Sequence, residues 1–528
     1  MRRAESRSGD GAADPAAAAT GGEADFASVF ADRQRALLLI IALSMTVISL
    51  VPLWGRRFVP MQDYPQHLLQ AQMLTAQNDP RLDYPENFEI RLKVGSYAAF
   101  YALTYGLDQL LPTEVAGKVA VSLYALLTGW LVAMLIIRSA SGFAPWGALL
   151  FFAVLFNQQY YLGNLNFLYS LPLLLLTLED HRRFSEKRAT VWPSLRQALW
   201  QLALLLSHPF TFLAYLGLAG TGSLLFRRDR EKLLRGLAPV AAGLLLVLIW
   251  FVLQQNDPGD SLDRIEWRPA KRALLFLGLP FVGMRWEHGV SWFTSLIWIA
   301  IGCLMVYLPL SDRHKPTGIL ERYALFLLLT TLGVLLMPFR VEDYTFVNMR
   351  MSSIAYFLLA MVCSRIRFRG ASRCALPLLV LALLCHGVVK QWRISDEIAR
   401  AEPVVTEIPR NARVMPLVFA NDSPELEPRV FDTHLHVHNY YHILVGGGFS
   451  PYFWSMSMTP VHYKPGAERP APGEYRPDRF EWQAHSADYQ YFLVRGGPPA
   501  FDRYLTRWCE RVADSGEWAL YQRREARR

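Results

Sequence analysis

The sequence has few cysteines and few charged residues for a chain of 528 residues. Its 5 cysteines include no CxxC pair, which argues against a disulfide framework. Charged residues make up only 19% of the chain, whereas hydrophobic residues make up 52%. The net charge of +9 comes mainly from short basic segments between apolar runs, which orient a membrane protein and contact anionic lipid headgroups. No nucleic-acid binding is indicated.

Apolar runs that lack charge are the main feature of the sequence. Residues 36–54, 115–137 and 237–253 each approach the roughly 20 apolar residues that cross the hydrocarbon core as a helix. We therefore predict a polytopic α-helical membrane protein with about eleven transmembrane helices, if each hydrophobic run crosses once. The predicted spans are residues 36–54, 115–137, 143–157, 165–179, 196–207, 210–226, 236–253, 290–309, 323–338, 350–364 and 374–390.

The basic residues between these spans all fall on one side of the predicted topology. They are Arg138, Arg182, Arg183, Lys187, Arg188, Arg227, Arg228, Arg230, Lys232, Arg235, Arg313, Lys315, Arg365, Arg367, Arg369 and Arg373. The positive-inside rule assigns this side, together with the N-terminus, to the cytoplasm. Residues 97–111 are apolar but short, and counting them as a span would place the basic clusters outside. We expect them to form a helix at the outer interface.

This topology divides the chain into three parts. Residues 1–32 are expected to be a disordered cytoplasmic tail, since they show no periodicity, and the first apolar run lacks the cleavage site of a signal peptide. Residues 33–391 form the transmembrane domain, which includes the first external loop at 55–114. Residues 392–528 form a small extracytoplasmic α/β domain, with strands at 414–419, 489–494 and 518–522 and a helix near 500–513.

The first external loop begins with Asp63-Tyr64-Pro65-Gln66-His67, shortly after the first span. The apolar spacing after Pro65 predicts a helix with proline in its first turn, so Asp63 lies at or near the N-cap. Asp63 is then either a helix cap or, with His67, a catalytic group that faces a cleft between the membrane and external domains. A carboxylate there could take a proton from an acceptor hydroxyl or coordinate a divalent metal.

Uncharged polar and aromatic residues recur at the external ends of other predicted spans. Tyr160, Tyr161, Asn164 and Asn166 form one cluster, and His208 lies at the junction of two spans. Tyrosines and amides beside glycine suit hydrogen bonding to sugar hydroxyls, although they are also ordinary interface anchors. For His208 the simpler alternative is a turn residue that satisfies freed backbone carbonyls.

Basic residues on the external side need a separate explanation. Arg350 begins an apolar span, where a central charge costs on the order of 2.5–3.5 kcal/mol, and Arg340 precedes it in the same loop. Lys271 and Arg285 lie in an external loop that the positive-inside rule should deplete of basic residues. These side chains either bind a lipid-linked phosphate, for which the planar fork of arginine is suited, or snorkel and pair with nearby acids.

A histidine-rich segment in the external domain has two interpretations. His434, His436 and His438 could lie on one face of a strand, where they might bind zinc. Residues 438–445 also fit a helix, which would separate these side chains.

Together these features resemble the integral membrane glycosyltransferases of the GT-C superfamily, which include bacterial lipid A aminoarabinose transferases and protein O-mannosyltransferases. The resemblance covers residues 36–390 and rests on Asp63 soon after the first span and on Asn348-Met349-Arg350 at the start of a late span. The aromatic stretch 97–103 and an external domain that ends in Trp518-Ala519-Leu520-Tyr521 add to it. It implies a GT-C-like membrane domain in a bacterial inner (plasma) membrane.

The resemblance also implies a reaction, the transfer of a sugar from a polyprenyl-phosphate donor to a glycan, lipid or protein acceptor at the outer face. Asp63 would be the catalytic base or a metal ligand, and Arg350, with Arg340, would hold the phosphate. Many relatives carry paired acids in the first loop, where this sequence has Asp-Tyr-Pro-Gln-His, so metal dependence and the role of His67 stay open. Competing classes are a transporter or lipid flippase, with ionisable groups near the midplane, and a non-catalytic envelope assembly protein.

Overall fold

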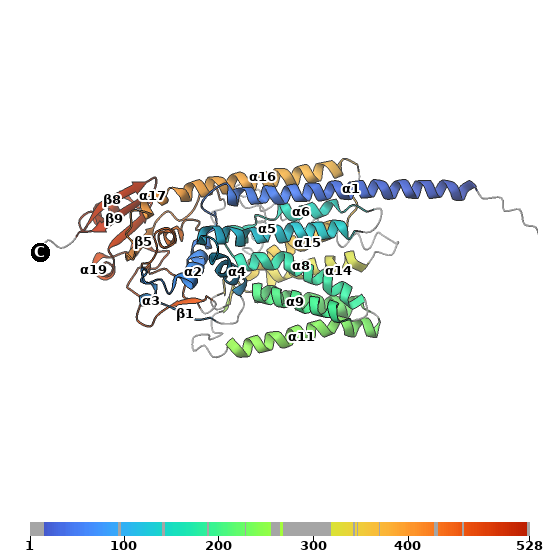
Figure 1. Ribbon diagram of the computed structural model, residues 1–528, viewed down its shortest axis with the longest axis horizontal. Coiled ribbons are helices and arrows are strands. Elements are labelled where there is room, and N and C mark those ends of the chain that lie inside the picture. Colours follow the sequence, from blue (N-terminus) through green and yellow to red (C-terminus); the bar gives the residue numbers. More distant parts are fainter. Residues whose placement is uncertain are drawn as a thin grey trace, which may run out of the picture.

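The structure is a computed structural model, and it describes residues 15–92, 97–139, 143–186, 190–227, 229–254, 265–267, 318–341, 344–345, 347–368, 370–426, 431–456 and 459–524. Lys271, Arg285 and the predicted span at 290–309 lie outside these residues. The long helices run side by side along the long axis of the molecule, and a β-sheet lies beyond one end of them (Figure 1).

Among the described residues, six helices are long and apolar enough to cross a membrane. They lie in α1 (Pro15–Trp54), α5 (Thr113–Ile137), α10 (Pro209–Phe226), α11 (Arg230–Gln254), α14 (Gly318–Leu336) and α16 (Ser372–Ala399). Large apolar side chains remain exposed on these helices, for example Ile40, Leu248 and Leu378. Such extensive apolar surface marks contact with lipid, so the chain has the features of an integral membrane protein.

Three further predicted spans coincide with helices that are shorter or more polar. These are α8 (Leu165–Glu186), α9 (Val191–Ser207) and α15 (Val347–Cys363). The last two have 17 residues each, whereas α8 has 22 and carries Glu179 and Asp180. A helix of this length extends about 33 Å, so the two ends of α8 are separated by about the thickness of a hydrocarbon core. The described helices do not establish the predicted total of about eleven spans.

The predicted span at 143–157 is wrong as a single helix. The segment instead contains a 3₁₀ turn, η1 (Trp146–Leu149), and one turn of α-helix, α6 (Leu150–Ala153). A Cβ at Gly147 would collide with the backbone carbonyl of Cys363 at the end of α15, so the two backbones approach more closely than side-chain-bearing residues allow. The segment is almost entirely buried, where irregular backbone can find partners inside the protein.

Residues 55–114 fold into short elements at the end of the helices nearest the sheet. These are α2 (Tyr64–Ala76), α3 (Tyr84–Asn87), β1 (Phe88–Ile90) and α4 (Ala98–Asp108). The helix expected within 97–111 is confirmed as α4, whose 11 residues extend only about 16 Å, too short to span a membrane. At the other end of the molecule, α1 begins at Pro15, inside the segment predicted to be disordered.

The C-terminal part contains a four-stranded sheet in the order β5-β7-β9-β8. Its strands are β5 (Val414–Val418), β7 (Tyr491–Arg495), β9 (Trp518–Arg523) and β8 (Cys509–Ser515). β5 and β7 are parallel, and the other two pairs are antiparallel. Helix α16 leads into this part without a break at residue 392, where the sequence places the start of the external domain. The three predicted strands coincide with β5, β7 and β9, although the C-terminal helix differs from prediction.

The helix predicted near 500–513 is only partly correct. α20 (Pro499–Leu505) ends early, because residues from Cys509 onward pair with β9 across a turn at Gly516, whose φ is 59°. Of the two interpretations of the histidine-rich segment, the strand is wrong and the helix over 438–445 is largely correct, because the segment forms turns that lead into η3 (Val437–Asn439) and α18 (Tyr440–Leu444). The remaining short elements are α7 (Gln158–Leu162), β2 (Ile265–Glu266), β3 (Arg340–Val341), β4 (Tyr344–Thr345), α17 (Glu402–Val405), β6 (Val461–Tyr463), η4 (Pro477–Arg479) and α19 (Trp482–His485).

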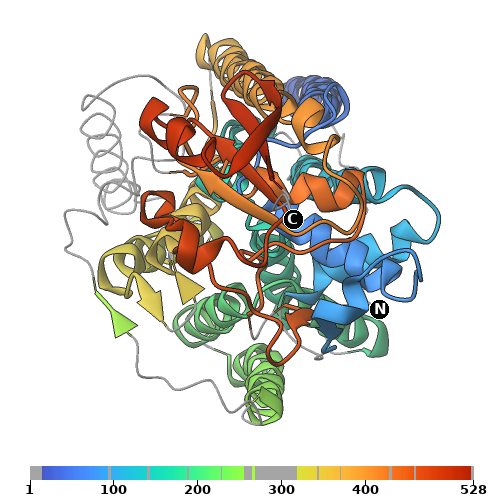
Figure 2. The same ribbon diagram turned by 90° about the vertical axis from the view of Figure 1, so that its left-hand side faces the viewer.

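The segment 55–114 is tied to the C-terminal part by backbone and side-chain hydrogen bonds. β1 pairs antiparallel with β6. On α2, the side-chain amides of Gln66 and Gln70 donate to the carbonyls of Tyr452 and Trp454, each at 2.6 Å. The same two glutamines accept from the backbone N–H groups of Trp454 and Val461. Figure 2, seen from this end, shows the blue segment beside orange and red ones, so distant parts of the chain meet here.

Candidate active site at the junction with the C-terminal part

Backbone hydrogen bonds hold Asp63 at the junction end of the helices. The N–H of Gln62 donates to the carbonyl of Tyr161 at 2.9 Å, and the N–H of Asp63 donates to that of Leu162 at 3.0 Å. Gly163, the C-cap of α7, has a φ of 84°, and a Cβ there would lie 3.0 Å from Asp63 N. The short helix α7 is therefore a platform for the Asp63 backbone.

The side chain of Asp63 does not cap α2. Although Asp63 occupies the N-cap position, its carboxylate makes no capping hydrogen bond. Its Oδ1 lies 3.2 Å from Nδ1 of His436, whose Nε2 lies 3.2 Å from Oε1 of Glu474. The three side chains are buried, with 11%, 1% and 18% of their surfaces exposed. The Asp63–His436–Glu474 cluster thus joins the segment 55–114 to the C-terminal part.

The protonation states in this cluster depend on one another. Burial alone lowers the pKa of His436, but the negative charges of Glu474 and Asp63 outweigh burial and raise this pKa to about 10. Burial raises the pKa of Asp63, the interaction with His436 opposes that rise, and the charge of Glu474 adds to it. At neutral pH His436 is therefore an imidazolium, and its charge offsets part of the rise that burial causes in the pKa of Asp63.

His67 lies beside the cluster as a neutral side chain. Its Nδ1 is 2.7 Å from the hydroxyl of Tyr101, and its ring centroid is 5.5 Å from that of Trp454. The Trp454 ring also lies 5.2 Å from the ring of His436. Burial, together with the positive charge of His436, lowers the pKa of His67 to about 3. His67 can orient other groups by hydrogen bonding, but it does not carry charge at neutral pH.

A second cluster at the same end contains Arg350, Tyr97 and His208. The Tyr97 hydroxyl lies 2.8 Å from Nε2 of His208, so the imidazole contacts this tyrosine. Arg350 is only 6% exposed, and its guanidinium lies 6.0 Å from the ring centroid of Phe167 and within electrostatic range of His208. Burial raises the pKa of Tyr97, and the charge of Arg350 opposes that rise. Within the described residues, Arg350 Nε has no hydrogen-bond partner and no acid pairs with the guanidinium.

The start of α4 connects the two clusters. Tyr97 contacts the second cluster, whereas Tyr101, about 6 Å further along the helix, contacts His67 and lies within electrostatic range of Asp63. Asn166 fixes this turn, because its Oδ1 accepts from Phe100 N at 2.8 Å and its Nδ2 donates to the Tyr97 carbonyl at 2.9 Å. Tyr97 has a φ of 75°, a conformation that a non-glycine residue keeps only where its surroundings hold it.

Tyr160, Tyr161 and Asn164, which the sequence suggests as sugar contacts, make their contacts within the scaffold around α7. The Tyr160 hydroxyl donates to the side-chain oxygen of Gln391 at 2.6 Å, and the Asn164 amide donates to that of Gln159 at 2.6 Å. The buried Tyr161 carries the backbone carbonyl that anchors Gln62. In the structure, these residues position the Asp63 platform.

Arg340 lies on a separate three-stranded sheet, β2-β3-β4. The register of this sheet places Arg340 opposite Glu266 and Thr345. Lys271 and Arg285, the other basic residues that the sequence suggests for phosphate binding, lie outside the described residues. Arg350 is thus the predicted phosphate ligand that the structure places within electrostatic range of a second predicted site residue, His208.

The described residues contain no group of three or more His, Cys, Asp or Glu side chains arranged to hold a metal ion. His434 Nε2 lies 3.1 Å from Glu397, and His438 Nδ1 lies 3.0 Å from the carbonyl of Leu435. The zinc interpretation of the three histidines is therefore wrong. No such group includes Asp63, which lies beside one described histidine, His436.

Sequence reasoning missed three residues of these clusters. The sequence pattern around His436 suggests only a zinc ligand, and Glu474 lies in a Pro- and Gly-rich connection with no periodicity to interpret. Tyr97 opens the aromatic stretch 97–103, which is the one local signal that could have identified it.

Comparisons with known proteins identify a distantly similar structure. No protein-family model matches the chain, and no curated protein matches it. A cryo-EM structure of the arabinofuranosyltransferase AftD from mycobacteria is similar, with a TM-score of 0.45 and 14% sequence identity over 93% of this chain. The chain spans 40% of the length of that structure. A likeness this distant carries no functional argument.

Proposed function

We propose that this protein is a membrane glycosyltransferase that transfers a sugar from a polyprenyl-phosphate donor to the hydroxyl of an acceptor. The observation that carries the proposal is a buried carboxylate, Asp63, that does not cap its helix and contacts a charged histidine. Arg350, a buried cation with no described acidic partner, lies within electrostatic range of Tyr97, about one helical turn before the Tyr101 that faces Asp63. A base and an anion-binding group are the two functions that this transfer needs.

In the proposed reaction, Asp63 takes the proton of the acceptor hydroxyl as its oxygen attacks the anomeric carbon of the sugar. The bond between that carbon and the donor phosphate oxygen breaks, and its electron pair leaves with the polyprenyl phosphate. Arg350 stabilises the negative charge that grows on the leaving phosphate. His436 keeps Asp63 ionised and available as a base, and Glu474 holds the imidazole from the other side.

The neighbouring residues have positioning roles in this proposal. Tyr97 positions the Arg350 guanidinium and is itself held by His208, and the neutral His67 fixes Tyr101 beside Asp63. The proposed steps use one carboxylate, Asp63, as the base, with His436 between it and Glu474. This assignment would explain a first loop without paired acids.

The proposal includes a location and partners. The apolar helices place the protein in a membrane, which we take to be a bacterial inner membrane, with the Asp63 end and the C-terminal part outside and the N-terminus in the cytoplasm. The partners are the polyprenyl-phosphate sugar, membrane lipids and a glycan, lipid or protein acceptor. The leaving phosphate would lie at headgroup level, so the base and the cation should meet near one membrane face.

The test is sugar transfer by purified protein in nanodiscs, supplied with radiolabelled polyprenyl-phosphate sugars and a membrane extract as acceptor. We expect Asp63→Asn to lower transfer by roughly 10²–10⁴-fold, because it removes the base. Arg350→Gln should also abolish most transfer, because the leaving phosphate loses its cation. Asp396→Asn and Arg393→Gln are the matched controls, since these exposed side chains lie on α16 and should leave transfer unchanged.

Every variant must match the wild type in its expression level and in its thermal unfolding temperature in the same nanodiscs. Full transfer by both site variants would contradict the assigned residues. A wild-type protein that uses no donor, while it moves lipid-linked sugar across the bilayer, would establish the transporter or flippase class instead. A wild-type protein that shows neither sugar transfer nor lipid transport would indicate a non-catalytic assembly protein.

A further inference from the structure

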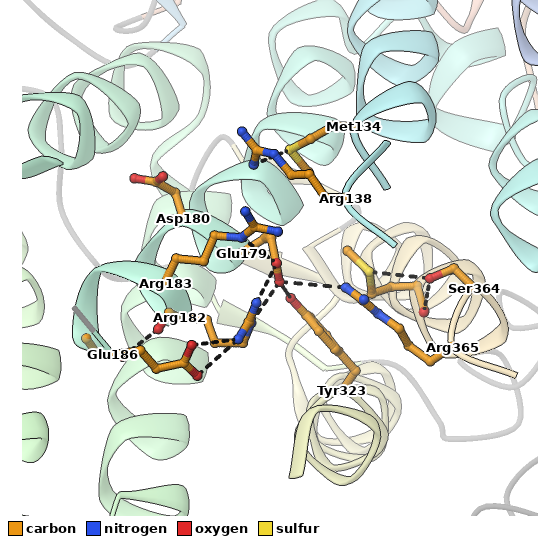
Figure 3. A network of polar contacts seen from close by, with 12 residues as sticks. Met134, Arg138, Glu179, Asp180, Arg182, Arg183, Glu186, Tyr323, Ser364 and Arg365 are labelled. Carbon is orange, nitrogen blue, oxygen red and sulfur yellow. Dashed lines mark hydrogen bonds and ion pairs between the residues drawn. The ribbon is translucent and has the colours of Figure 1, made fainter. Parts of the chain in front are cut away.

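A second set of buried charges lies at the other end of α8, where the ends of α8, α10 and α15 meet the start of α14. Figure 3 shows its centre, the carboxylate of Glu179, which is only 1% exposed. Arg182 donates to both carboxylate oxygens, at 2.7 Å and 3.0 Å. Arg183 donates to Oε1 at 2.9 Å, and the Tyr323 hydroxyl donates to Oε2 at 3.2 Å.

These four hydrogen bonds saturate Glu179. A carboxylate offers about four lone-pair sites, and all of them are filled here. Arg365 approaches the same carboxylate only to 3.7 Å, too far for a hydrogen bond, and its Nε has no hydrogen-bond partner. Glu179 therefore cannot satisfy the third guanidinium that faces it.

Two more arginines add to this excess of positive charge. Arg322 is 7% exposed and lies over the ring of Phe226 at 5.4 Å, and no described acid pairs with it. Arg227 contacts Glu186 at 3.3 Å, and its Nε, like that of Arg322, has no partner among the described residues. Arg182, Arg322 and Arg365 all lie within electrostatic range of the Tyr323 hydroxyl.

We call Arg182, Arg183, Arg227, Arg322 and Arg365 the arginine cluster. In the described part of the chain, the acids that contact it are Glu179 and Glu186. Five cations thus have two carboxylates among them, and Glu186 is 42% exposed. Glu179 and Arg322 are buried, where an unpaired charge is costly. An anion with several acceptor oxygens would offset this excess, and arginine forks match phosphate geometry.

The surroundings indicate that this anion belongs to a lipid. Leu224 and Leu225, which directly precede Phe226, are 61% and 64% exposed, so apolar surface adjoins the arginines. Glu186 ends α8 about 33 Å from Leu165, which places the cluster at headgroup level when the Asp63 end lies at the other face. A free phosphate would use the arginines but not the exposed leucines.

We infer that the arginine cluster binds the phosphate of an anionic phospholipid, whose acyl chains cover the leucines at the end of α10. Arg322, Arg365 and Arg227 would donate to the phosphate oxygens, while Glu179 holds Arg182 and Arg183 in place. The bound lipid would lock the ends of α8, α10, α14 and α15 together. This site is separate from the proposed glycosyltransferase site and does not depend on that function.

The test measures lipid binding to the purified full chain by native mass spectrometry and by thermal unfolding. Detergent-solubilised protein receives phosphatidylglycerol, phosphatidylcholine or inorganic phosphate in parallel. We expect phosphatidylglycerol to bind preferentially and to raise the unfolding temperature. The double variant Arg322→Gln/Arg365→Gln should bind it roughly tenfold or more weakly, since each arginine near a lipid surface contributes about 1 kcal/mol.

Two matched variants keep the test decisive. Arg196→Gln, which removes an arginine paired with Asp180 at 2.5 Å, should keep the full lipid response. Arg322→Lys/Arg365→Lys should fold and retain part of it, because the charge remains. An equal response to phosphatidylcholine, or an unchanged response in the glutamine variant, would overturn the inference. If inorganic phosphate alone reproduces the whole response, a lipid is not the ligand.

Discussion

The two ends of α8 lie beside two clusters of buried charge that are built in different ways. Near Leu165, the Asp63–His436–Glu474 cluster has two carboxylates around one cation, and Asp63 is hundreds of residues away in sequence from the other two. Near Glu186, the arginine cluster surrounds Glu179, and two of its arginines lie three and four positions away on the same helix. Tertiary contacts assemble the first cluster, whereas helical periodicity supplies the centre of the second.

The difference suggests a division of tasks between the ends. A carboxylate held beside an imidazolium can accept a proton, because the imidazolium favours its ionised form and leaves some of its lone pairs open. A carboxylate whose lone-pair sites are all filled, as two arginines and a tyrosine fill those of Glu179, cannot do so, and the remaining cations favour binding of an anion. We therefore expect changes at the Asp63 end to alter chemistry and stability, and changes at the Glu179 end to alter stability and lipid response.

The largest effect should come from His436→Gln, which removes the cation between two buried carboxylates. Breaking a buried ion pair by removing one partner costs about 3–5 kcal/mol, and the pKa of Asp63 should rise further once its countercharge is lost. Unfolding in mixed micelles measures the first effect. The acid limb of the pH–rate profile of transfer measures the second and should move to higher pH. A variant with wild-type stability would show that the cluster is not ion-paired.

The pH dependence of the wild type sharpens this prediction. The pKa of His436 is raised from its ordinary value of 6.5 to about 10, so its stabilising charge is fully present below pH 6.5 and lost as the pH rises toward 10. The free energy of unfolding should fall over that interval. His436→Gln should lack this part of the decline, and identical pH curves for the two proteins would contradict the assignment.

Glu179→Gln tests the other end. The amide keeps the shape but leaves several guanidinium groups without a buried counterion, so we expect a loss of about 3 kcal/mol in unfolding free energy. Added phosphatidylglycerol should recover part of this loss if it supplies negative charge. Transfer measured at equal amounts of folded protein should stay near the wild-type level, whereas a selective loss of transfer would link this end to the reaction.

A smaller effect is expected for Gly163→Ala in the platform below Asp63. The φ of 84° disfavours alanine, and the added Cβ would press on Asp63 N and Tyr64 N, each 3.0 Å away. We expect about 1–3 kcal/mol of destabilisation together with reduced transfer, because the Asp63 backbone must shift. Gly217→Ala on α10 is the control, since no atom lies within 4 Å of its Cβ position. Equal stability and transfer in both variants would rule out the platform.

The smallest effect should follow Tyr101→Phe. This change removes the hydroxyl that lies 2.7 Å from His67 Nδ1, at a cost of about 1 kcal/mol. If His67 only positions Tyr101, transfer should fall far less than in Asp63→Asn. A loss as severe as that of Asp63→Asn would assign His67 and Tyr101 a direct part in proton transfer.

Much of the helical architecture could be predicted from sequence, because hydropathy is a local property. The uncharged runs at 36–54 and 115–137 became long helices, and the short stretch at 97–111 became the non-spanning α4. The run at 143–157 has the same composition, yet its close contact with the end of α15 replaces a helix with tight turns. Pairing with β9 likewise overrode the helical pattern after Leu505.

The candidate site was predictable only in part. Asp63 and Arg350 could be singled out, because a carboxylate after the first span and an arginine inside an apolar run are unusual. The residues that surround them could not: Gln62 and His436 are 374 positions apart, and Glu474 lies in a segment without periodicity. Hydrogen bonds from Asn166, Gln66 and Gln70 then fix these distant segments against each other.

By itself, the sequence determined which segments are apolar enough to enter a membrane and which helix faces carry charge, because burial in hydrocarbon and the helical repeat depend on neighbouring residues. Only the tertiary structure decided that Asp63 contacts a histidine instead of capping its helix, and that Arg365 lies near an acid whose lone-pair sites other groups already fill. The energy of interaction between two charges depends on their distance and their burial, and both depend on how segments far apart in the chain are packed.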